Sequence, residues 1–496
     1  MELQFENQAC RYLHRLIWEV KEQEQTQEVR LPDGMPDIGN ILAAWGQCVM
    51  RSKEWNGDHI GTSGGVMAKV LYAPADGSPP QSVEVWLPIQ LRWNLPDNGK
   101  NGSIRCSWLL KGVDGRTLSA RKMMVRANVS VLAEALEPSE EMLARADQVP
   151  EDVQMLRNIY PARLPVEAGE KAFLIDEEFT LPEGKPKKIV CCTVIPQLSE
   201  QKVLGGKVVF RGCGNLHMLY EDQDGRLHSC DRQLEFSQYA DLDRDYDKDA
   251  QAQTVMALSS LEPELQEGTV RVKCGMVAQY LIADLAMLDL VEDAYSPQRQ
   301  VTLESREVRL PMVLDSCREK LRCGCTVPEK AERVVDVSVF MEQPVVRRAG
   351  ELAEVSCSGL VQVLYFDENG DLQGRSGRWN GAWELPTSAE TELLADIHSV
   401  DTPQVSAGTS QMELSLEVQM AADAVASHPM SMVTGLEMGQ VKQSDPARPS
   451  LILRRAGDST LWEMAKGTGS TVDAIRKANG LTGEPLDDRL LLIPVS

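Results

Sequence analysis

The chain has 496 residues and a formal net charge of −23, and 43% of its residues are hydrophobic. This length suits about three to four domains of ordinary size, and the hydrophobic content is that of globular domains with buried cores. The acidic balance argues against a nucleic-acid partner, because phosphates are bound by basic surfaces.

The sequence also bears on the cellular compartment. It opens without the basic segment and apolar run of a signal peptide, and no stretch approaches the ~18 apolar residues of a membrane span. Its twelve cysteines are scattered, which favours a reducing compartment over a disulfide framework. We therefore expect the protein to stay in the compartment where it is made.

Residues 1–25 are predicted to form an amphipathic helix. Leu13, Ile17 and Val20 would share one helical face, with polar residues opposite. We expect this helix to dock on the domain that follows it, in preference to binding a partner.

The rest of the chain divides by pattern into three β-domains, a connector, a linker and a terminal module. The connector is expected to contain two short helices, one beginning near Ser139 and one near Pro150. The predicted segments are 26–136, 176–300 and 301–438 for the mainly β, antiparallel domains, 137–175 for the helical connector, 439–449 for the linker and 450–496 for the module.

A repeated pattern identifies the three β-domains. Each has Leu-Tyr, three further residues, then Asp or Asn followed by Gly, at Leu71-Tyr72, Leu219-Tyr220 and Leu364-Tyr365. The Gly supplies the positive φ of a tight hairpin turn. After each copy an apolar–polar alternation predicts a strand with one buried face. The alternating residues are Ile104, Cys106, Trp108 and Leu110, then Val270, Val272, Cys274 and Met276, then Met412, Leu414, Leu416 and Val418.

Before each Leu-Tyr copy stands Glu-x-x-Leu-Pro, at 28–32, 178–182 and 307–311. The third copy lies farther from its Leu-Tyr than the other two, so an inserted loop is expected there. That loop would hold Cys317, Cys323 and Cys325, which lack paired C-x-x-C spacing and disfavour a zinc site.

No pattern in the sequence points to catalysis. The six histidines form no H-x-x-x-H array, and no G-x-S-x-G or complete phosphate-binding loop occurs. The alternating aspartates from Asp241 to Asp249 lack the glycine and glutamate of a calcium loop, so a solvated acidic loop is favoured. We expect no enzyme activity, no cofactor and no metal.

The last segment predicts the order strand–helix–helix–strand. Leu451–Leu453 would be the first strand, Thr460 to Glu463 a capping box, Ser470 to Asp473 the start of a second helix and Leu490–Ile493 the return strand. Asn479-Gly480 would end the second helix. The residues Gly-Asp-Ser-Thr-Leu-Trp at 457–462 and Ala-Asn-Gly-Leu at 478–481 resemble the LysM family.

The β-domains resemble SPOCS domains, once called DUF3794. Three of them with a C-terminal LysM module resemble the SipL-like family of spore-coat morphogenetic proteins. That resemblance implies a non-enzymatic scaffold in the mother-cell cytoplasm at the forespore surface. It would bind the coat morphogenetic ATPase through LysM and help tether the coat to the forespore outer membrane.

The resemblance places partner-binding residues in two LysM loops. Two alternatives remain open for single residues: Trp462 could belong to the core, and Asp458 could cap the first helix. N-acetylglucosamine polymers such as peptidoglycan are the alternative ligand, and self-association through exposed β-edges is a weaker possibility. The predicted residues are Gly457, Asp458, Ser459, Thr460, Leu461, Trp462, Asn479, Gly480 and Leu481.

Overall fold

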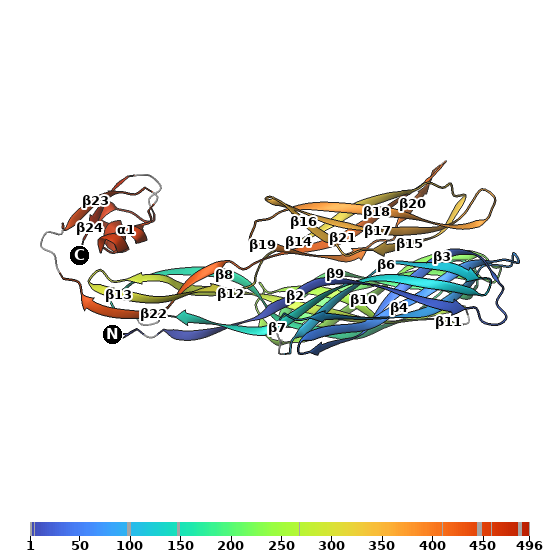
Figure 1. The fold of residues 1–496 in the computed structure, drawn as a ribbon, viewed down its shortest axis with the longest axis horizontal. Helices are drawn as coiled ribbons and strands as arrows, with labels where there is room; N and C mark the ends of the chain where they lie inside the picture. The colour runs from blue at the N-terminus through green and yellow to red at the C-terminus, as the bar shows by residue number, and fades with distance from the viewer. Residues whose placement is uncertain are drawn as a thin grey trace.

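Alternating apolar residues build long antiparallel strands, and these run along the length of an elongated molecule (Figure 1). The mainly β prediction is confirmed, since only two of the described elements are helices. The computed structural model describes residues 2–3, 5–96, 101–145, 149–266, 268–408, 410–443, 449–457, 459–484 and 489–495.

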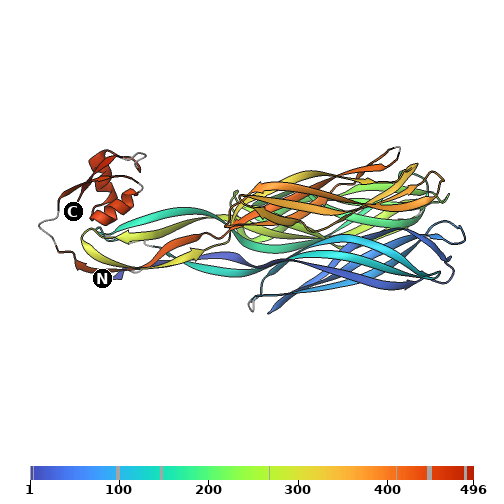
Figure 2. The same ribbon diagram turned by 45° about the horizontal axis from the view of Figure 1, so that its top comes forward.

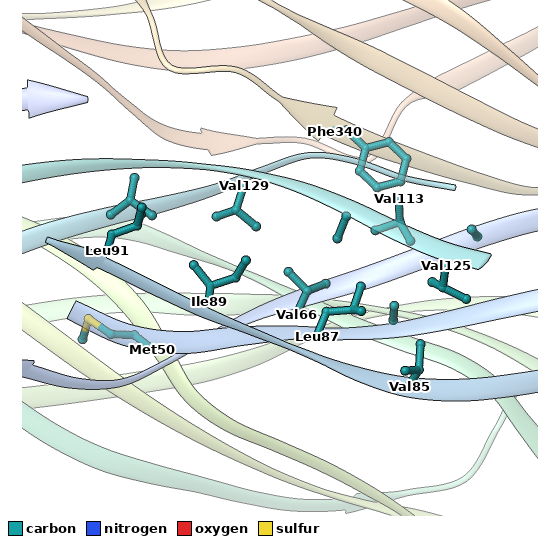
Figure 3. Close-up of a cluster of buried hydrophobic side chains, with 14 of the residues drawn as sticks. Met50, Val66, Val85, Leu87, Ile89, Leu91, Val113, Val125, Val129 and Phe340 are labelled. Atoms are coloured by element: carbon teal, nitrogen blue, oxygen red, sulfur yellow. The ribbon is translucent and has the colours of Figure 1, made fainter. Parts of the chain in front are cut away.

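The first β-domain consists of two three-stranded sheets packed face to face. Their shared core includes Val66, Leu87 and Val129, all fully buried (Figure 3). The alternation after the first Leu-Tyr produces this core, because every second residue of β5 points inward. One sheet has the order β2-β7-β6, with β2 Glu6–Arg30, β7 Lys122–Arg145 and β6 Ser103–Ser119; the other has the order β3-β4-β5, with β3 Ile38–Asn56, β4 His59–Pro74 and β5 Gln81–Asn94.

The second β-domain repeats this plan with fewer, longer strands. Its predicted inner row, Val270 to Met276, is fully buried. The sheets are β11-β12-β8, with β11 Gln251–Gln266, β12 Thr269–Tyr295 and β8 Gln154–Phe179, and β10-β9, with β10 Leu227–Tyr246 and β9 Pro186–Asp222.

The third β-domain is one eight-stranded sheet folded over its own core. A single pair, Gly324 with Asn380, links β14 to β18. The sheet contains β14 Met312–Val327, β15 Arg333–Met341, β16 Val345–Ala349, β17 Leu352–Phe366, β18 Leu372–Pro386, β19 Thr391–Val400, β20 Gln404–Ala407 and β21 Met412–Ala426. A separate sheet contains β13 Arg299–Arg309, β22 Pro429–Val441 and β1 Glu2–Leu3.

Three long ribbons, one from each domain, extend past the domain cores toward the chain termini (Figure 1). They are β2 with β7, β8 with β12, and β13 with β22, and we call their shared extension the stalk. One hydrophobic cluster there includes Leu143, Leu164, Leu290 and Met432, which come from all three ribbons. The three β-domains therefore share a hydrophobic core in the stalk and are not packed independently of one another.

The Leu-Tyr repeat explains how the three domains meet. Leu71, Leu219 and Leu364 are each at most 1% exposed, and all three belong to one cluster between the domains. The neighbouring Tyr points the other way, as strand alternation requires: the Tyr72 hydroxyl donates to the Pro36 carbonyl and that of Tyr220 donates to the Glu183 carbonyl. Each copy thus carries one residue for the interdomain core and one for its own domain.

The predicted hairpin turns are confirmed. Gly77, Gly225 and Gly370 have φ of 75°, 79° and 81°, a region that favours glycine. They close the turns β4–β5, β9–β10 and β17–β18, so the repeated motif holds corresponding positions in the three domains. Figure 2 shows the strands of the three domains, blue to cyan, green, and yellow to orange, as neighbouring groups that run along the same long direction.

The predicted N-terminal helix and helical connector are both wrong. Residues 6–30 form strand β2, which pairs with β7 from Glu6–Arg145 to Arg30–Lys122. Residues 137–145 complete β7, and residues 154–175 belong to β8. Local helix propensity is worth only tenths of a kilocalorie per residue, and continuous pairing along the ribbons outweighs it.

The third Glu-x-x-Leu-Pro copy is also misplaced in the prediction, and no inserted loop follows it. Leu310-Pro311 lies between β13 and β14, which follow each other directly in the chain. Val327-Pro328 holds the corresponding position, because Val327 precedes Leu364 by 37 residues, against 40 from Leu31 to Leu71. The three clustered cysteines therefore lie within strand β14 and not in a loop.

The terminal module has the predicted strand–helix–helix–strand order. Its elements are β23 Leu451–Arg455, α1 Leu461–Thr468, α2 Val472–Asn479 and β24 Leu490–Pro494. Of the predicted linker 439–449, residues 439–441 belong to β22, and residues 444–448 lie outside the described residues.

Candidate partner-binding module

Two caps define the helices of the terminal module. The Thr460 side chain accepts a hydrogen bond from the Glu463 backbone N–H, and the Glu463 carboxylate accepts one from the Thr460 N–H, so the predicted capping box is present. Gly480 ends α2 with φ of 63°. These caps fix the two loops in which partner-binding residues are predicted.

The two loops are joined by a hydrogen bond within the chain. The backbone N–H of Leu461 donates to Oε2 of Glu484 at 2.9 Å. A carboxylate is well placed at this position, because the N-terminus of a helix carries partial positive charge. The Leu461 amide has no partner within α1, and it already donates to an acid from the second loop.

The predicted site residues fall into different environments. Leu461 is 0% exposed and belongs to the module core. The Asn479 side chain bonds to both the N–H and the carbonyl of Leu492, which ties α2 to β24. Gly457, Thr460 and Gly480 are exposed, Ser459 and Leu481 are half-buried, and Asp458 lies outside the described residues.

Trp462 contacts the rest of the chain. Its ring meets that of Tyr295 edge to face, with centroids 4.8 Å apart, and its Nε1–H donates to Asp293 at 2.8 Å. Lys466 forms an ion pair with the same carboxylate at 2.7 Å. These contacts dock the module on the end of strand β12, at the tip of the stalk.

Tyr295 completes this docking contact. Its hydroxyl donates to the Ser470 carbonyl at 2.9 Å, and the side chain is buried in the module core cluster. Burial, with a smaller contribution from the Asp293 charge, raises the pKa of Tyr295 to about 12. The tyrosine therefore stays a neutral hydrogen-bond donor.

The outer face of the module sheet carries four leucines, beside Arg455, which pairs with Leu490. Leu453 is 64% exposed and Leu490 is 56% exposed, and Leu451 and Leu492 are exposed beside them. Strand alternation sends Leu491 and Ile493 into the core and leaves these four outside. We call these four residues the leucine face. The sequence predicts the two strands but does not show which leucines are left uncovered.

Buried polar contacts join the three β-domains to one another. The buried carboxylate of Asp336, from the third domain, accepts from Trp45 of the first at 2.8 Å and pairs with His217 of the second at 2.5 Å. Between the first and second domains, the Val194 N–H donates to the Gln47 side chain at 2.7 Å. Each domain therefore contacts both others.

The electrostatics of this junction favour a charged pair. Burial lowers the pKa of His217, but the charges and hydrogen bonds of Asp336 and Asp231 outweigh it and raise the pKa to about 10. Burial raises the pKa of Asp336, yet His217 and Trp45 bring it below its usual range. Sequence patterns gave no sign of this junction, because its members are far apart in the chain.

Among the described residues, no group of three or more His, Cys, Asp or Glu side chains is arranged to hold a metal. Cys317, Cys323 and Cys325 face the core of the third domain, where Cys323 packs beside Cys357. The three cysteines are separated by even numbers of residues along one strand, so they share one face, and the cluster is explained as core packing.

Comparison with known proteins gives one match. Residues 185–264 match the family model described as SipL, SPOCS domain. The matched segment covers β9 and β10 and most of β11 in the second β-domain. It supports a SipL-like family and a coat-associated role in sporulation.

Searches among curated proteins and among solved structures each gave no match. Within the described part of the chain, no helix has the length and apolar character needed to cross a membrane.

Proposed function

We propose that the chain is a non-enzymatic scaffold of endospore coat assembly. In this proposal the LysM-like module binds the coat morphogenetic ATPase in the mother-cell cytoplasm, and the chain helps to tether the coat to the forespore outer membrane. The family match in the second β-domain supports the coat-associated part. The contact with the ATPase rests on the module's surface.

The leucine face is the observation that carries the proposed protein contact. Four leucines on a two-stranded sheet expose an apolar surface, and contiguous exposed apolar patches mark sites of protein interaction. A polysaccharide would gain less here, because four of the side chains on this face are leucines, with Arg455 at its edge. A protein partner with an apolar contact surface suits it better.

The hydrogen bond between Leu461 and Glu484 favours the same choice. Binding of acetamido groups at the loops would draw on backbone amides, and the Leu461 amide already donates to the Glu484 carboxylate. Displacing an occupied buried or half-buried hydrogen bond costs about 0.5–1.5 kcal/mol. The alternative function, binding of peptidoglycan or other N-acetylglucosamine polymers, therefore starts at a disadvantage.

A titration of the full chain distinguishes the two functions. One arm uses the coat morphogenetic ATPase, and the other uses chitin oligomers and purified peptidoglycan. We expect saturable binding to the ATPase and none to the glycans. Glycan binding without ATPase binding would overturn the scaffold proposal.

Matched variants test the surface. Leu453→Glu places a charge on the leucine face, and Leu204→Glu makes the same change at a similarly exposed leucine of β9. We expect at least tenfold weaker ATPase binding for Leu453→Glu and unchanged binding for Leu204→Glu, at equal thermal stability. Equal loss in both variants would contradict a contact through the module.

A further inference from the structure

A cavity of about 170 Å³ lies where the three β-domains meet. Strands β3 and β6 of the first domain, β9 and β11 of the second, and β15 and β19 of the third all contribute to its wall. Its volume exceeds the 150 Å³ of an engineered apolar protein cavity that binds benzene. A molecule in this space would contact all three domains at once.

The wall is mostly apolar. Trp45, Met50 and Trp108 line it from the first domain, Ile195 and Met256 from the second, and Phe340 from the third. Phe340 also inserts between domains, since it packs in the core of the first domain beside Val113 (Figure 3). Walls of this kind favour an apolar or aromatic body.

Two buried polar atoms of the lining residues have no hydrogen-bond partner among the residues that the structure describes. They are Nε1 of Trp108 and Oγ1 of Thr254, and Thr254 is 1% exposed. The indole can only donate, and the hydroxyl can donate or accept. Buried polar groups without a partner in the protein are commonly satisfied by water or by another bound molecule.

Two ionisable groups of the cavity wall, His217 and Asp396, have partners within the protein. His217 lies between the carboxylates of Asp231 and Asp336. Asp396 accepts from the Ser107 hydroxyl at 3.1 Å and from the Ile397 N–H at 2.8 Å. Neither of these two groups is a free counter-charge for a ligand. Burial lowers the pKa of His398, a third group of the wall, to about 4, so this imidazole is neutral near pH 7.

We propose that this interdomain cavity binds a small neutral molecule with an aromatic or aliphatic body and one hydroxyl or carbonyl oxygen. The body contacts the apolar wall, and the oxygen bonds to the Trp108 indole or the Thr254 hydroxyl. Because three domains form the wall, the bound molecule would hold them together. This site is separate from the terminal module and does not depend on its partner.

The test uses phenol and toluene as probes, which have similar bodies and differ in the hydroxyl. Binding to the full chain is measured by calorimetric titration and by the fluorescence of the lining tryptophans. We expect one site per chain, with phenol bound roughly 2–10-fold more tightly than toluene, as one hydrogen bond predicts. Absence of saturable binding by either probe would show a cavity that holds water only, and would overturn the proposal.

Three variants locate the site. Thr254→Val removes the hydroxyl at nearly constant shape, so the preference for phenol is expected to fall while toluene binding is kept. Val339→Phe fills the cavity and is expected to abolish both, whereas Val345→Phe makes the same change at an exposed position outside it. Binding that survives Val339→Phe in a folded chain would place the probes elsewhere and contradict the assignment.

Discussion

At the scale of single residues, Asp336 joins the three β-domains through Trp45 and His217. A buried ion pair requires that both partners stay charged, since an unpaired buried charge is strongly unfavourable. The raised pKa of His217 and the lowered pKa of Asp336 meet that condition near neutral pH.

The pair gives the molecule a specific pH dependence. The folded pKa of His217 is about 10, above the ordinary value near 6.5. Its contribution to stability is therefore complete below about pH 6.5 and is lost as the pH rises toward 10. The contribution of Asp336, whose pKa is lowered, is constant over this range and is lost only in acid.

Asp336→Asn tests this junction. We expect the variant to be less stable by about 3–5 kcal/mol at pH 6, the usual cost of breaking a buried pair, and the difference from wild type to shrink at pH 9. The measurement is the free energy of unfolding from denaturant titrations at both values of pH. A pH-independent difference would show that His217 is not charged in the folded protein.

A second residue-scale prediction concerns the docking of the terminal module. Asp293→Ala removes the acceptor of Trp462 and the ion-pair partner of Lys466. We expect the module to detach from the stalk, seen as a larger radius of gyration in X-ray scattering and faster amide exchange at Tyr295. Asp289→Ala, on the same strand but with an exposed side chain, is the control. An unchanged radius in Asp293→Ala would mean that other contacts hold the module.

At the scale of elements, the Leu-Tyr strand contributes both to the core between the domains and to the core of its own domain. Its alternation directs the Leu to the junction between domains and the Tyr to its own domain. The turn that follows needs glycine, and the sequence predicts that turn directly from Asp-Gly or Asn-Gly.

Leu219→Ala tests the interdomain role of this strand. Leu219 is 0% exposed in the cluster shared by three domains, so we expect a loss of about 2–5 kcal/mol from the removed contacts and the cavity left behind. Leu204→Ala, at an exposed position of the same strand, should change stability by less than about 0.5 kcal/mol. Similar losses in both variants would contradict the interdomain packing.

The same scale shows which elements the sequence could and could not predict. Strong period-two rows such as Val270, Val272, Cys274 and Met276, all fully buried, were predicted as strands correctly. The capping box at Thr460 was predicted because it is a local signal. The helix predicted from Leu13, Ile17 and Val20 failed because pairing with β7, more than 90 residues away, decides that segment.

Those features of the candidate site that depend on neighbouring residues could be predicted from the sequence, and the others could not. Caps and turns of the terminal module follow from neighbouring residues, and they were found. The docking of Trp462 on Tyr295 joins residues 167 positions apart, and the leucine face depends on which side of a short sheet is covered. Neither can be read from spacing along the chain.

At the scale of the whole molecule, the three β-domains and the stalk share their cores. The stalk cluster takes residues from all three ribbons, and the junction cluster takes residues from all three domains. We therefore expect one cooperative transition for the β-domains in scanning calorimetry, with calorimetric and van't Hoff enthalpies in agreement. Three separate transitions would indicate independent domains.

The whole molecule also sets where the module stands. The module docks on the end of β12, at the tip of the stalk. Its leucine face stays exposed in this position. We propose that the β-domains form a rigid support and that the module supplies the contact with the partner.

Hydrogen–deuterium exchange of the full chain, with and without the coat morphogenetic ATPase, tests this proposal most directly. We predict slower exchange in β23 and β24 when the ATPase is bound, and little change in the β-domains. Protection confined to the loops 457–461 and 479–484 would place the contact at those loops instead. Protection confined to the β-domains, or none at all, would contradict a scaffold that binds its partner through the terminal module.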